Sequence, residues 1–362
     1  MSSEASRPGT DVDGRGGLRA LGLDARVMFF SGKGGVGKTT LAAATAVARA
    51  DTGERVLLVS TDPAHNLGHL FECRLGDAPR TLIDSDGAGG GRLDVVEMDP
   101  AAITARHLKD VGATIRRMMP EHLHHEVDKY LKLAADAPGT HEAAVLERIA
   151  ELTETSFDRA APVAEAPGLG RFGRSAGSAA DYDVLIFDTA PSGHTSRLMA
   201  LPEMMTAWTD GLLRRRAASE KFGEALVGLG GARKDEDSRD ARIRQLLTRR
   251  RKRFAGLREL LTDESRTAFV LVLAAERLPV AETIEFHEHL RSQGISVRAL
   301  LVNKRSPRDA GDFLAQRRSA EDRHVAELNR ALPGLPEMNL RLSPGEIRGI
   351  DGLRAVPSLI EP

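Results

Sequence analysis

Short apolar runs alternate with longer amphipathic stretches from Arg26 onward. The runs read VMFF at 27–30, VLLV at 56–59, LDVV at 93–96, VLIF at 184–187, FVLVL at 269–273 and ALLV at 299–302. Continuous apolar runs of this length are typical of parallel strands that are buried on both faces. Helical stretches such as LAAATAVARA and PVAETIEFHEHLRSQG separate several of them. The pattern predicts an α/β fold with an open, doubly wound, mostly parallel sheet.

Two segments show helical periodicity with no strand between their helices. Residues 100–155 contain HLKDVGATIRRMM, HHEVDKYLKLAAD and HEAAVLERIAEL, and residues 203–262 contain EMMTAWTDGLLRRR and RIRQLLTRRRKRFAGLREL. We expect these two insertions to build a helical subdomain within one domain that spans 25–362. A composition rich in Gly, Ala and charge predicts flexible loops at about 161–181 and 228–240.

Composition limits the class of protein and its partners. The 362 residues include 51 lysines plus arginines against 52 aspartates plus glutamates, so no basic surface for nucleic acid or an anionic bilayer is indicated. The single cysteine, Cys73, excludes an intramolecular disulfide and a structural zinc cage, which favours oxygen ligands for any metal and a reducing compartment. Residues 1–24 lack the apolar core of a signal peptide and read as a disordered leader. No apolar run approaches the length of a membrane span, and we expect a cytoplasmic protein.

The strongest chemical signal is the string SGKGGVGKTT at 31–40, between the first predicted strand and an alanine-rich helix. It satisfies the phosphate-loop template through Gly32, Gly37, Lys38 and Thr39. Glycines let successive backbone N–H groups face the β-phosphate, and the helix N-terminus adds positive charge. We expect Lys38 to neutralise the β- and γ-phosphates and the Thr39 hydroxyl to bind Mg²⁺. The predicted phosphate-binding set is Gly32, Lys33, Gly34, Gly35, Val36, Gly37, Lys38, Thr39 and Thr40.

Two aspartates stand at or just beyond the carboxyl ends of predicted strands, where open α/β sheets bind ligands. Asp62 lies in STDPAHN at 60–66, and a carboxylate there is placed to orient an attacking water. An Asp-Pro pair is also typical of a plain turn. Asp188 ends the run DVLIFD, the arrangement that holds Mg²⁺ through a water molecule.

The string GKGGVGKT resembles the deviant phosphate-loop ATPases. In that family the first lysine reaches across a dimer to the partner's nucleotide, so the resemblance implies that Lys33 acts in trans in a homodimer that binds ATP and Mg²⁺. STDPAHN and DTAPSGHT at 188–195 are similar to the first and second switches of the arsenical-pump and tail-anchored-protein-targeting branch. Ser192 and Ser196 stand where that branch has Thr and Leu. Together, the loop string implies Lys33 and Lys38, and the first switch string implies Asp62, as the catalytic residues.

Further similarities lie toward the C-terminus, and the resemblance as a whole runs from Arg26 to nearly the last residue. Asn303 closes the run ALLVN and resembles the family's adenine-binding asparagine, with a turn-capping asparagine as the alternative. Glu276 in AAERLPVAET resembles a glutamate that contacts nucleotide near the dimer interface. Pro344 in SPGEIRG resembles part of a loop that flanks adenine.

The resemblance implies Mg²⁺-dependent ATP hydrolysis that switches a homodimer between open and closed states. One expected output is binding or targeting of hydrophobic, tail-anchored-type membrane-protein clients. The alternative is the energising subunit of an arsenite or anion efflux pump, working with a membrane transporter subunit. Arsenite activation in the family uses a cysteine cluster, which Cys73 alone does not provide. The CxxC zinc site of the eukaryotic targeting factor is also missing.

Two other features are set aside as structural. The histidines at 122, 124, 125, 287 and 289 lack the spacing of a metal motif and are interpreted as solvated. The run RRRKR at 249–253 interrupts a helix with apolar positions, so we interpret it as a charged helix face and expect no nucleic-acid partner.

Overall fold

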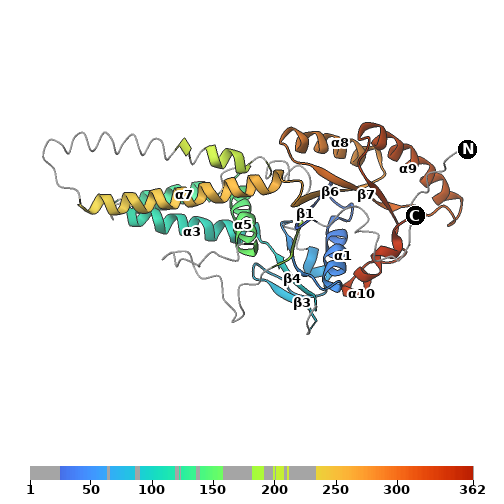
Figure 1. Ribbon diagram of the computed structural model, residues 1–362, viewed down its shortest axis with the longest axis horizontal. Helices are drawn as coiled ribbons and strands as arrows, with labels where there is room; N and C mark the ends of the chain where they lie inside the picture. The colour runs from blue at the N-terminus through green and yellow to red at the C-terminus, as the bar shows by residue number, and fades with distance from the viewer. Residues whose placement is uncertain are drawn as a thin grey trace, which may run out of the picture.

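The sheet has eight strands in the order β3-β4-β2-β5-β1-β6-β7-β8 (Figure 1). The computed structural model describes residues 25–62, 66–85, 90–118, 122, 124–135, 139–157, 182–190, 199, 201–207, 210–211 and 234–361. All neighbouring strands pair in parallel except β3, which runs antiparallel to β4. The strands are β1 Val27–Ser31, β2 Arg55–Ser60, β3 Arg80–Asp84, β4 Arg92–Glu97, β5 Val184–Asp188, β6 Thr267–Ala274, β7 Val297–Arg305 and β8 Glu337–Arg341. The predicted doubly wound, mostly parallel α/β fold is confirmed.

The six predicted strands are those with continuous apolar runs, and the two edge strands were not predicted. β3 and β8 are five residues each and expose part of their length, so their sequences RTLID and EMNLR mix polar and apolar positions. An edge strand buries less of its surface than a central one, and its sequence therefore lacks the apolar run that marks the others.

Helices cover both faces of the sheet. The face with α1 Lys38–Asp51, α2 Asn66–Leu70 and α10 Gly349–Arg354 buries Met28 and Phe30 of β1. The opposite face buries Phe29 of β1 beneath helices that include α5, α7 and α8. These and the remaining helical elements are α3 Pro100–Met118, α4 His124–Ala135, α5 Thr140–Phe157, α7 Lys234–Thr262, α8 Arg277–Ser292, α9 Asp312–Ala331 and the short 3-10 helix Val356–Leu359.

Three phenylalanines from neighbouring strands stack at the centre of the sheet. The ring of Phe29 lies 4.7 Å from that of Phe187 on β5 and 4.7 Å from that of Phe269 on β6. All three side chains are fully buried. Because β1, β5 and β6 are held together by this packing, the loops that follow their carboxyl ends start from a rigid base.

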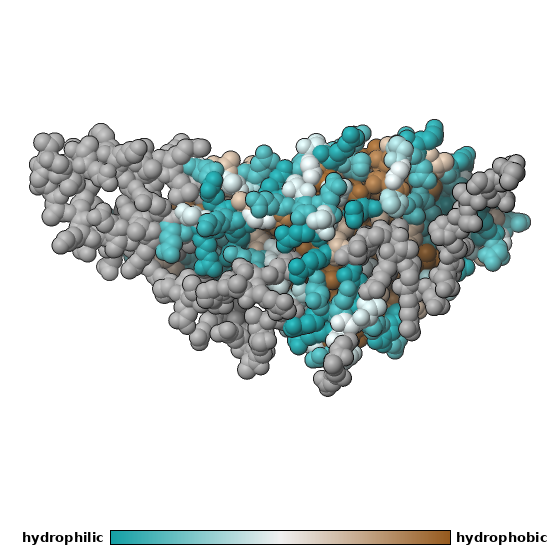
Figure 2. Space-filling view, in the orientation of Figure 1, coloured by the Kyte–Doolittle hydropathy of each residue, from teal (hydrophilic) through white to brown (hydrophobic). Residues whose placement is uncertain are grey.

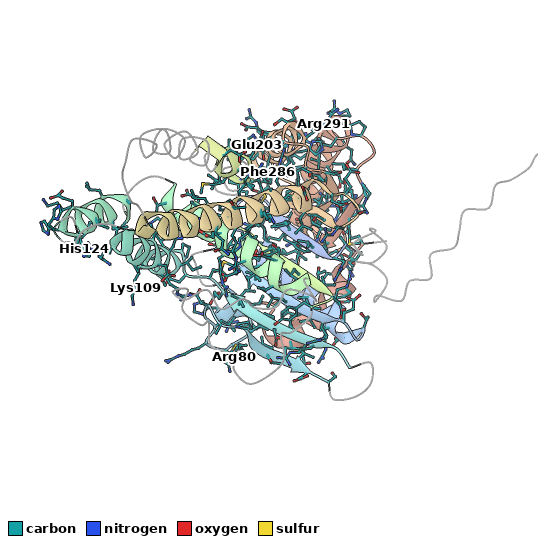
Figure 3. The ribbon with its side chains drawn as sticks, turned by 60° about the vertical axis from the view of Figure 1, so that its left-hand side comes forward. Arg80, Lys109, His124, Glu203, Phe286 and Arg291 are labelled. Atoms are coloured by element: carbon teal, nitrogen blue, oxygen red, sulfur yellow. The ribbon has the colours of Figure 1, made fainter. Side chains whose placement is uncertain are left out.

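Helices α3 and α7 extend away from the sheet and form an arm with α4 and α5 (Figures 1 and 3). His124, at the start of α4, lies at the outer end of this arm, whereas Arg80 of β3 lies on the sheet (Figure 3). The basic run of α7 faces acids of α5: Arg250 pairs with Glu147 at 2.7 Å and Arg253 with Glu154 at 2.8 Å. The run is therefore a charged helix face whose partners are within the protein.

Helix α7 begins earlier than the sequence suggested. Residues 234–240, which we expected in a flexible loop, are helical. The sequence of this stretch, KDEDSRD, has little apolar content and therefore predicted a loop.

Several expectations fall outside the described residues. These are the leader 1–24, the loop 161–181, residues 228–233, the Pro63–His65 part of the first switch and the second switch from Pro191 to Ser196. Within the described part of the chain, no helix is both long and apolar enough to cross a membrane. On the face shown in Figure 2, the described surface is mainly hydrophilic, with smaller apolar patches over the half that bears the sheet.

Candidate nucleotide site

The phosphate loop joins β1 to α1 at the carboxyl edge of the sheet and requires glycine at two close approaches. Gly32 has φ 152°, and a Cβ atom there would lie 2.0 Å from the carbonyl oxygen of Val272 on β6. Gly37 has φ 96°, and its Cβ would lie 2.3 Å from Nδ2 of Asn303. A side chain at Gly32 would push the loop away from β6, and one at Gly37 would displace the Asn303 amide and strain a left-handed backbone. The two glycines therefore fix the loop against the strands that follow it in the sheet.

Lys38 is buried at the start of α1, and its ammonium points back into the loop. Its Nζ donates a hydrogen bond of 3.0 Å to the carbonyl oxygen of Lys33. Burial lowers the pKa of Lys38, while the charges of Asp188 and Asp62 act in the opposite direction. The structure therefore brings together three of the predicted residues. Lys38 comes from the start of α1, Asp188 from the end of β5 and Asp62 from the segment just after β2.

Asp188 is completely buried at the end of β5 and faces the first turn of α1. Its Oδ2 accepts a hydrogen bond of 2.8 Å from Thr39 and one of 3.3 Å from Ser60. Burial raises the pKa of Asp188 to about 7, although the Thr39 hydrogen bond and the Lys38 charge lower it. Its other oxygen, Oδ1, is buried without a hydrogen-bond partner.

The orphaned Oδ1 beside the Thr39 hydroxyl fits a Mg²⁺ site. Mg²⁺ prefers oxygen ligands and uses one or two protein groups together with waters and substrate phosphates. A cation and its water shell would supply the partner that Asp188 lacks. Across the described ranges, His, Cys, Asp and Glu side chains do not gather in groups of three or more that could hold a metal. The interpretation of the histidines as solvated is wrong for His287, whose Nδ1 is buried, and for His124, whose Nε2 lies 2.9 Å from the Arg116 carbonyl oxygen.

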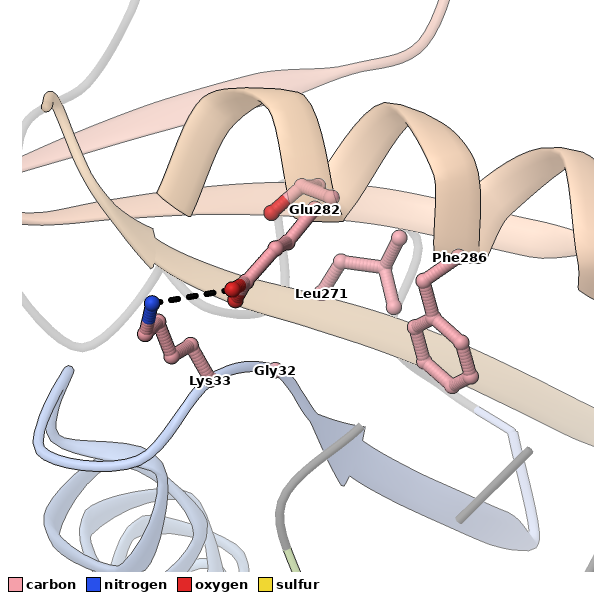
Figure 4. Close-up of a pocket in the computed structure, with 6 residues that line it drawn as sticks. Gly32, Lys33, Leu271, Glu282 and Phe286 are labelled. Atoms are coloured by element: carbon pink, nitrogen blue, oxygen red, sulfur yellow. Dashed lines mark hydrogen bonds and ion pairs between the residues drawn. The ribbon is translucent and has the colours of Figure 1, made fainter. Parts of the chain in front are cut away.

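Lys33 lies on the opposite side of the loop and contacts α8. Its Nζ donates to Oε1 of Glu282 at 2.9 Å (Figure 4). Glu282 was not predicted from the sequence, because nothing in the local pattern of an amphipathic helix distinguishes this glutamate from its neighbours. The contact depends on the position of α8 against β1 and β6.

The residues expected around adenine are distributed over three elements. Asn303, near the end of β7, donates from Nδ2 to the carbonyl oxygen of Val36 at 2.9 Å, and Lys304 donates to that of Gly35 at 2.7 Å. Glu276 precedes α8 and pairs with Arg317 at 3.2 Å. Pro344 is exposed in the loop after β8.

A hollow of about 240 Å³ lies between the loop and the N-terminus of α8. Its walls are Lys33, Gly34, Gly35, Val36, Ala274, Glu276, Leu278, Pro279 and Lys304. Glu276 thus joins the phosphate loop here, whereas Pro344 does not line this space. Thr40, the last residue of the predicted set, is half-buried in the first turn of α1.

Glu97 is a second residue that sequence reasoning missed. It ends β4, is 4% exposed, and pairs in register with Ser60 on β2. Its Oε1 accepts from the backbone N–H groups of Leu67 at 2.9 Å and Gly68 at 3.3 Å, in the first turn of α2. The signal was a glutamate that closes an apolar strand, LDVVE, in the same manner as Asp188 closes VLIFD. Glu97 anchors the far end of the segment that begins with Asp62.

These observations define a phosphate-loop protein of the doubly wound α/β class, with a buried lysine and a strand-end aspartate at one edge of the sheet. Comparison with known families agrees with this class and narrows it. Residues 25–361 match the anion-transporting ATPase family. The chain belongs to this family, which includes the branch that its switch strings resemble.

Individual relatives carry names from two groups. An arsenical pump-driving ATPase of Escherichia coli is 31% identical over 330 residues, covering 90% of this chain and 48% of the relative. A putative arsenical pump-driving ATPase 2 of Aquifex aeolicus is 28% identical, with 91% and 97% covered. A protein of Paramecium tetraurelia named ATPase ASNA1 homolog 1 is 26% identical, with 92% and 91% covered. The chain thus spans about half the length of the Escherichia coli relative.

Proposed function

We propose that the protein hydrolyses ATP with Mg²⁺. The observation that supports this most directly is the buried, unpartnered Oδ1 of Asp188 next to the Thr39 hydroxyl. A buried acceptor without a partner is costly, and a hydrated cation is the group that would satisfy it. The ATPase names of its relatives support the same reaction.

The residues around the loop take distinct roles in this proposal. Thr39 would bind Mg²⁺ directly and Asp188 would bind it through water; when bound, the ion neutralises charge on the transferred phosphate. Lys38 leaves the Lys33 carbonyl for the β- and γ-phosphates, because a charged phosphate is the stronger acceptor. Backbone N–H groups from Gly34 to Thr40 cradle the phosphates. Asp62 orients the attacking water, and catalysis rests on positioning and charge stabilisation.

Asn303, Glu276 and Pro344 form the proposed nucleoside side of the site. One N–H of Asn303 Nδ2 donates to the Val36 carbonyl, which leaves the second N–H and Oδ1 for contact with an adenine edge. Glu276 would approach the nucleotide from the hollow it lines with the loop. Pro344 would flank the base.

Substitution of Lys38 tests the hydrolysis proposal. Lys38→Ala should lower the rate of phosphate release by at least about 100-fold, because an uncompensated phosphate charge would face the loop. Lys109→Ala, at an exposed position of α3, is the matched control. Turnover in Lys38→Ala equal to that of wild type would refute the assignment.

The proposal includes a homodimer in which Lys33 acts on the partner's nucleotide. Lys33 is directed to α8 and away from Lys38 and Asp188, which face the other side of the loop. This arrangement supports a role for Lys33 at a site other than its own. Closure on ATP and opening after hydrolysis would then be the mechanical output.

We further propose that α3, α4, α5 and α7 form a helical subdomain that couples this switching to a hydrophobic membrane-protein client in the cytoplasm. Leu133 on α4 and Met204 near the same arm are 75% and 62% exposed, an unusual degree for large apolar side chains. The alternative, an energising subunit of an arsenite or anion pump with a membrane transporter, is supported by the names of several relatives.

Copurification distinguishes the two outputs. An Asp62→Asn protein should bind ATP, remain closed and retain its partner, because hydrolysis no longer opens the dimer. Recovery of membrane-protein tails by mass spectrometry would support the client proposal. Recovery of a transporter subunit in their place would support the pump.

A further inference from the structure

Lys33 and Glu282 form an ion pair between residues 249 positions apart, with 2.9 Å between Nζ and Oε1. Each side chain is 34% exposed. In Figure 4 Leu271 of β6 lies beside the pair, between Glu282 and Phe286, which is one turn further along α8. The contact therefore connects the phosphate loop to α8 at the edge of a recess that both elements line.

The backbone on each side of this pair is fixed. Gly32 lies against the Val272 carbonyl, with room for no Cβ, and the Lys33 carbonyl accepts from Lys38. On α8, Thr283 and Phe286 are buried and hold the helix to the core. Lys33 and Glu282 thus face each other because of the packing of two rigid elements.

We propose that Glu282 is a positioning residue that holds Lys33 on its own chain and thereby opposes closure of the ATP-bound dimer. The inference rests on the proposed trans role of Lys33. To reach a partner's phosphates, the ammonium must leave Glu282, since a carboxylate beside a triphosphate is strongly repelled. Every closed dimer would break two such pairs, one from each chain.

Nucleotide binding would weaken the restraint on Lys33 by removing its contact with Lys38. In the free chain Lys33 is held twice, by Glu282 through its side chain and by Lys38 through its carbonyl. Phosphates draw Lys38 away from that carbonyl, because a phosphate oxygen is the stronger acceptor. ATP binding would then remove the contact between Lys38 and the Lys33 carbonyl, and dimer closure would remove the contact between Lys33 and Glu282. Glu282 thereby sets the concentration of protein or ATP that dimer closure requires.

The test measures association of the full chain as a function of its concentration, by analytical ultracentrifugation with Mg²⁺ and ATP in an Asp62→Asn background. Glu282→Gln keeps the shape of the side chain but removes its charge. The concentration for half-association should fall about two- to thirtyfold, the range expected from the loss of two partly exposed ion pairs per dimer. Glu285→Gln, an exposed glutamate on the same helix, is the matched control and should leave this concentration unchanged.

A second background shows whether the effect passes through Lys33. In Lys33→Ala protein, Glu282→Gln should no longer promote association. Promotion that persists there, or an unchanged or raised half-association concentration with Lys33 present, would overturn the role of Glu282 while leaving the dimer intact. If no variant, including the parent, associates with ATP, the homodimer itself is wrong, and the role of Glu282 is refuted with it.

Discussion

The hydroxyl of Thr39 donates a 2.8 Å hydrogen bond to Asp188, and this bond joins the first turn of α1 to the end of β5, 149 positions away. Both residues were expected at a Mg²⁺ site, and in the free chain they bond to each other. The second oxygen of Asp188 remains buried and unpartnered. The pair therefore leaves one carboxylate oxygen without a hydrogen-bond partner, which supports the proposed Mg²⁺ site.

Asp188→Asn tests this interpretation. The asparagine oxygen can still accept from Thr39, but the charge that attracts a hydrated cation is lost. We expect nucleotide binding without Mg²⁺ to be retained, the gain in affinity on adding Mg²⁺ to disappear, and hydrolysis to fall at least about 100-fold. Isothermal titration calorimetry with and without Mg²⁺ measures the difference. A Mg²⁺ response equal to that of wild type would count against a metal role.

Mixed dimers test whether Lys33 acts in trans. Lys33→Ala and Asp62→Asn homodimers should each be inactive. If Lys33 serves the partner's nucleotide and Asp62 its own, a heterodimer combines both lesions at one site and leaves the other intact. ATPase activity should then recover to about half that of wild type in heterodimers purified through two different tags. Absence of recovery in verified heterodimers would argue for action in cis.

Metalloids should not stimulate this protein through thiols. Tight binding of trivalent arsenic or antimony requires two or three converging thiolates, because soft ligands select soft ions. Cys73 is the single cysteine of the sequence and is a free thiol. Antimonite and Cys73→Ser should therefore leave the hydrolysis rate unchanged. A several-fold stimulation that disappears in Cys73→Ser would restore the pump as the preferred function.

The stability of the arm should depend on pH through Glu147. Burial acts to raise the pKa of Glu147, but the hydrogen bond from His107 and the charges of Arg250 and Arg253 lower it to about 2. A depressed folded-state pKa gives stability that is present above the ordinary value near 4.5 and is lost as pH falls toward 2. The contribution at neutral pH is roughly 3 kcal/mol.

Urea unfolding of Glu147→Gln at several pH values measures this contribution. The variant should be less stable than wild type at pH 7, and the two free energies of unfolding should converge as pH approaches 2. Glu126→Gln, an exposed acid of α4, is the control and should follow wild type throughout. A pH-independent deficit in Glu147→Gln would mean that packing, and not charge, is responsible.

Glu97 should stabilise the start of α2. Glu97→Ala leaves the N–H groups of Leu67 and Gly68 without their acceptor, at a cost of about 1–3 kcal/mol in the free energy of unfolding. Glu97→Gln retains an oxygen acceptor and should lose less. Chemical denaturation of both variants gives the comparison. Equal losses would show that the negative charge matters and the hydrogen bonds do not.

The sequence by itself determined the central sheet and the phosphate loop. Buried parallel strands require continuous apolar runs, and a loop that wraps phosphate requires glycines at fixed spacing before a lysine. The apolar run of a strand and the glycine spacing of the loop each lie within ten residues, so both can be recognised in a short stretch of sequence. Asp62 and Asp188 were found for the same reason, because each stands at or next to the end of an apolar run.

Tertiary structure decided which of these residues meet. Glu282, Glu97 and the bond between Thr39 and Asp188 depend on strand order and on the packing of helices whose own sequences give no sign of their partners. The edge strands β3 and β8 also needed their neighbours, since their mixed sequences become strands only by pairing with β4 and β7. A side chain's neighbour across 249 positions, such as that of Lys33, is set by the sum of many packing contacts, and no local pattern encodes that sum.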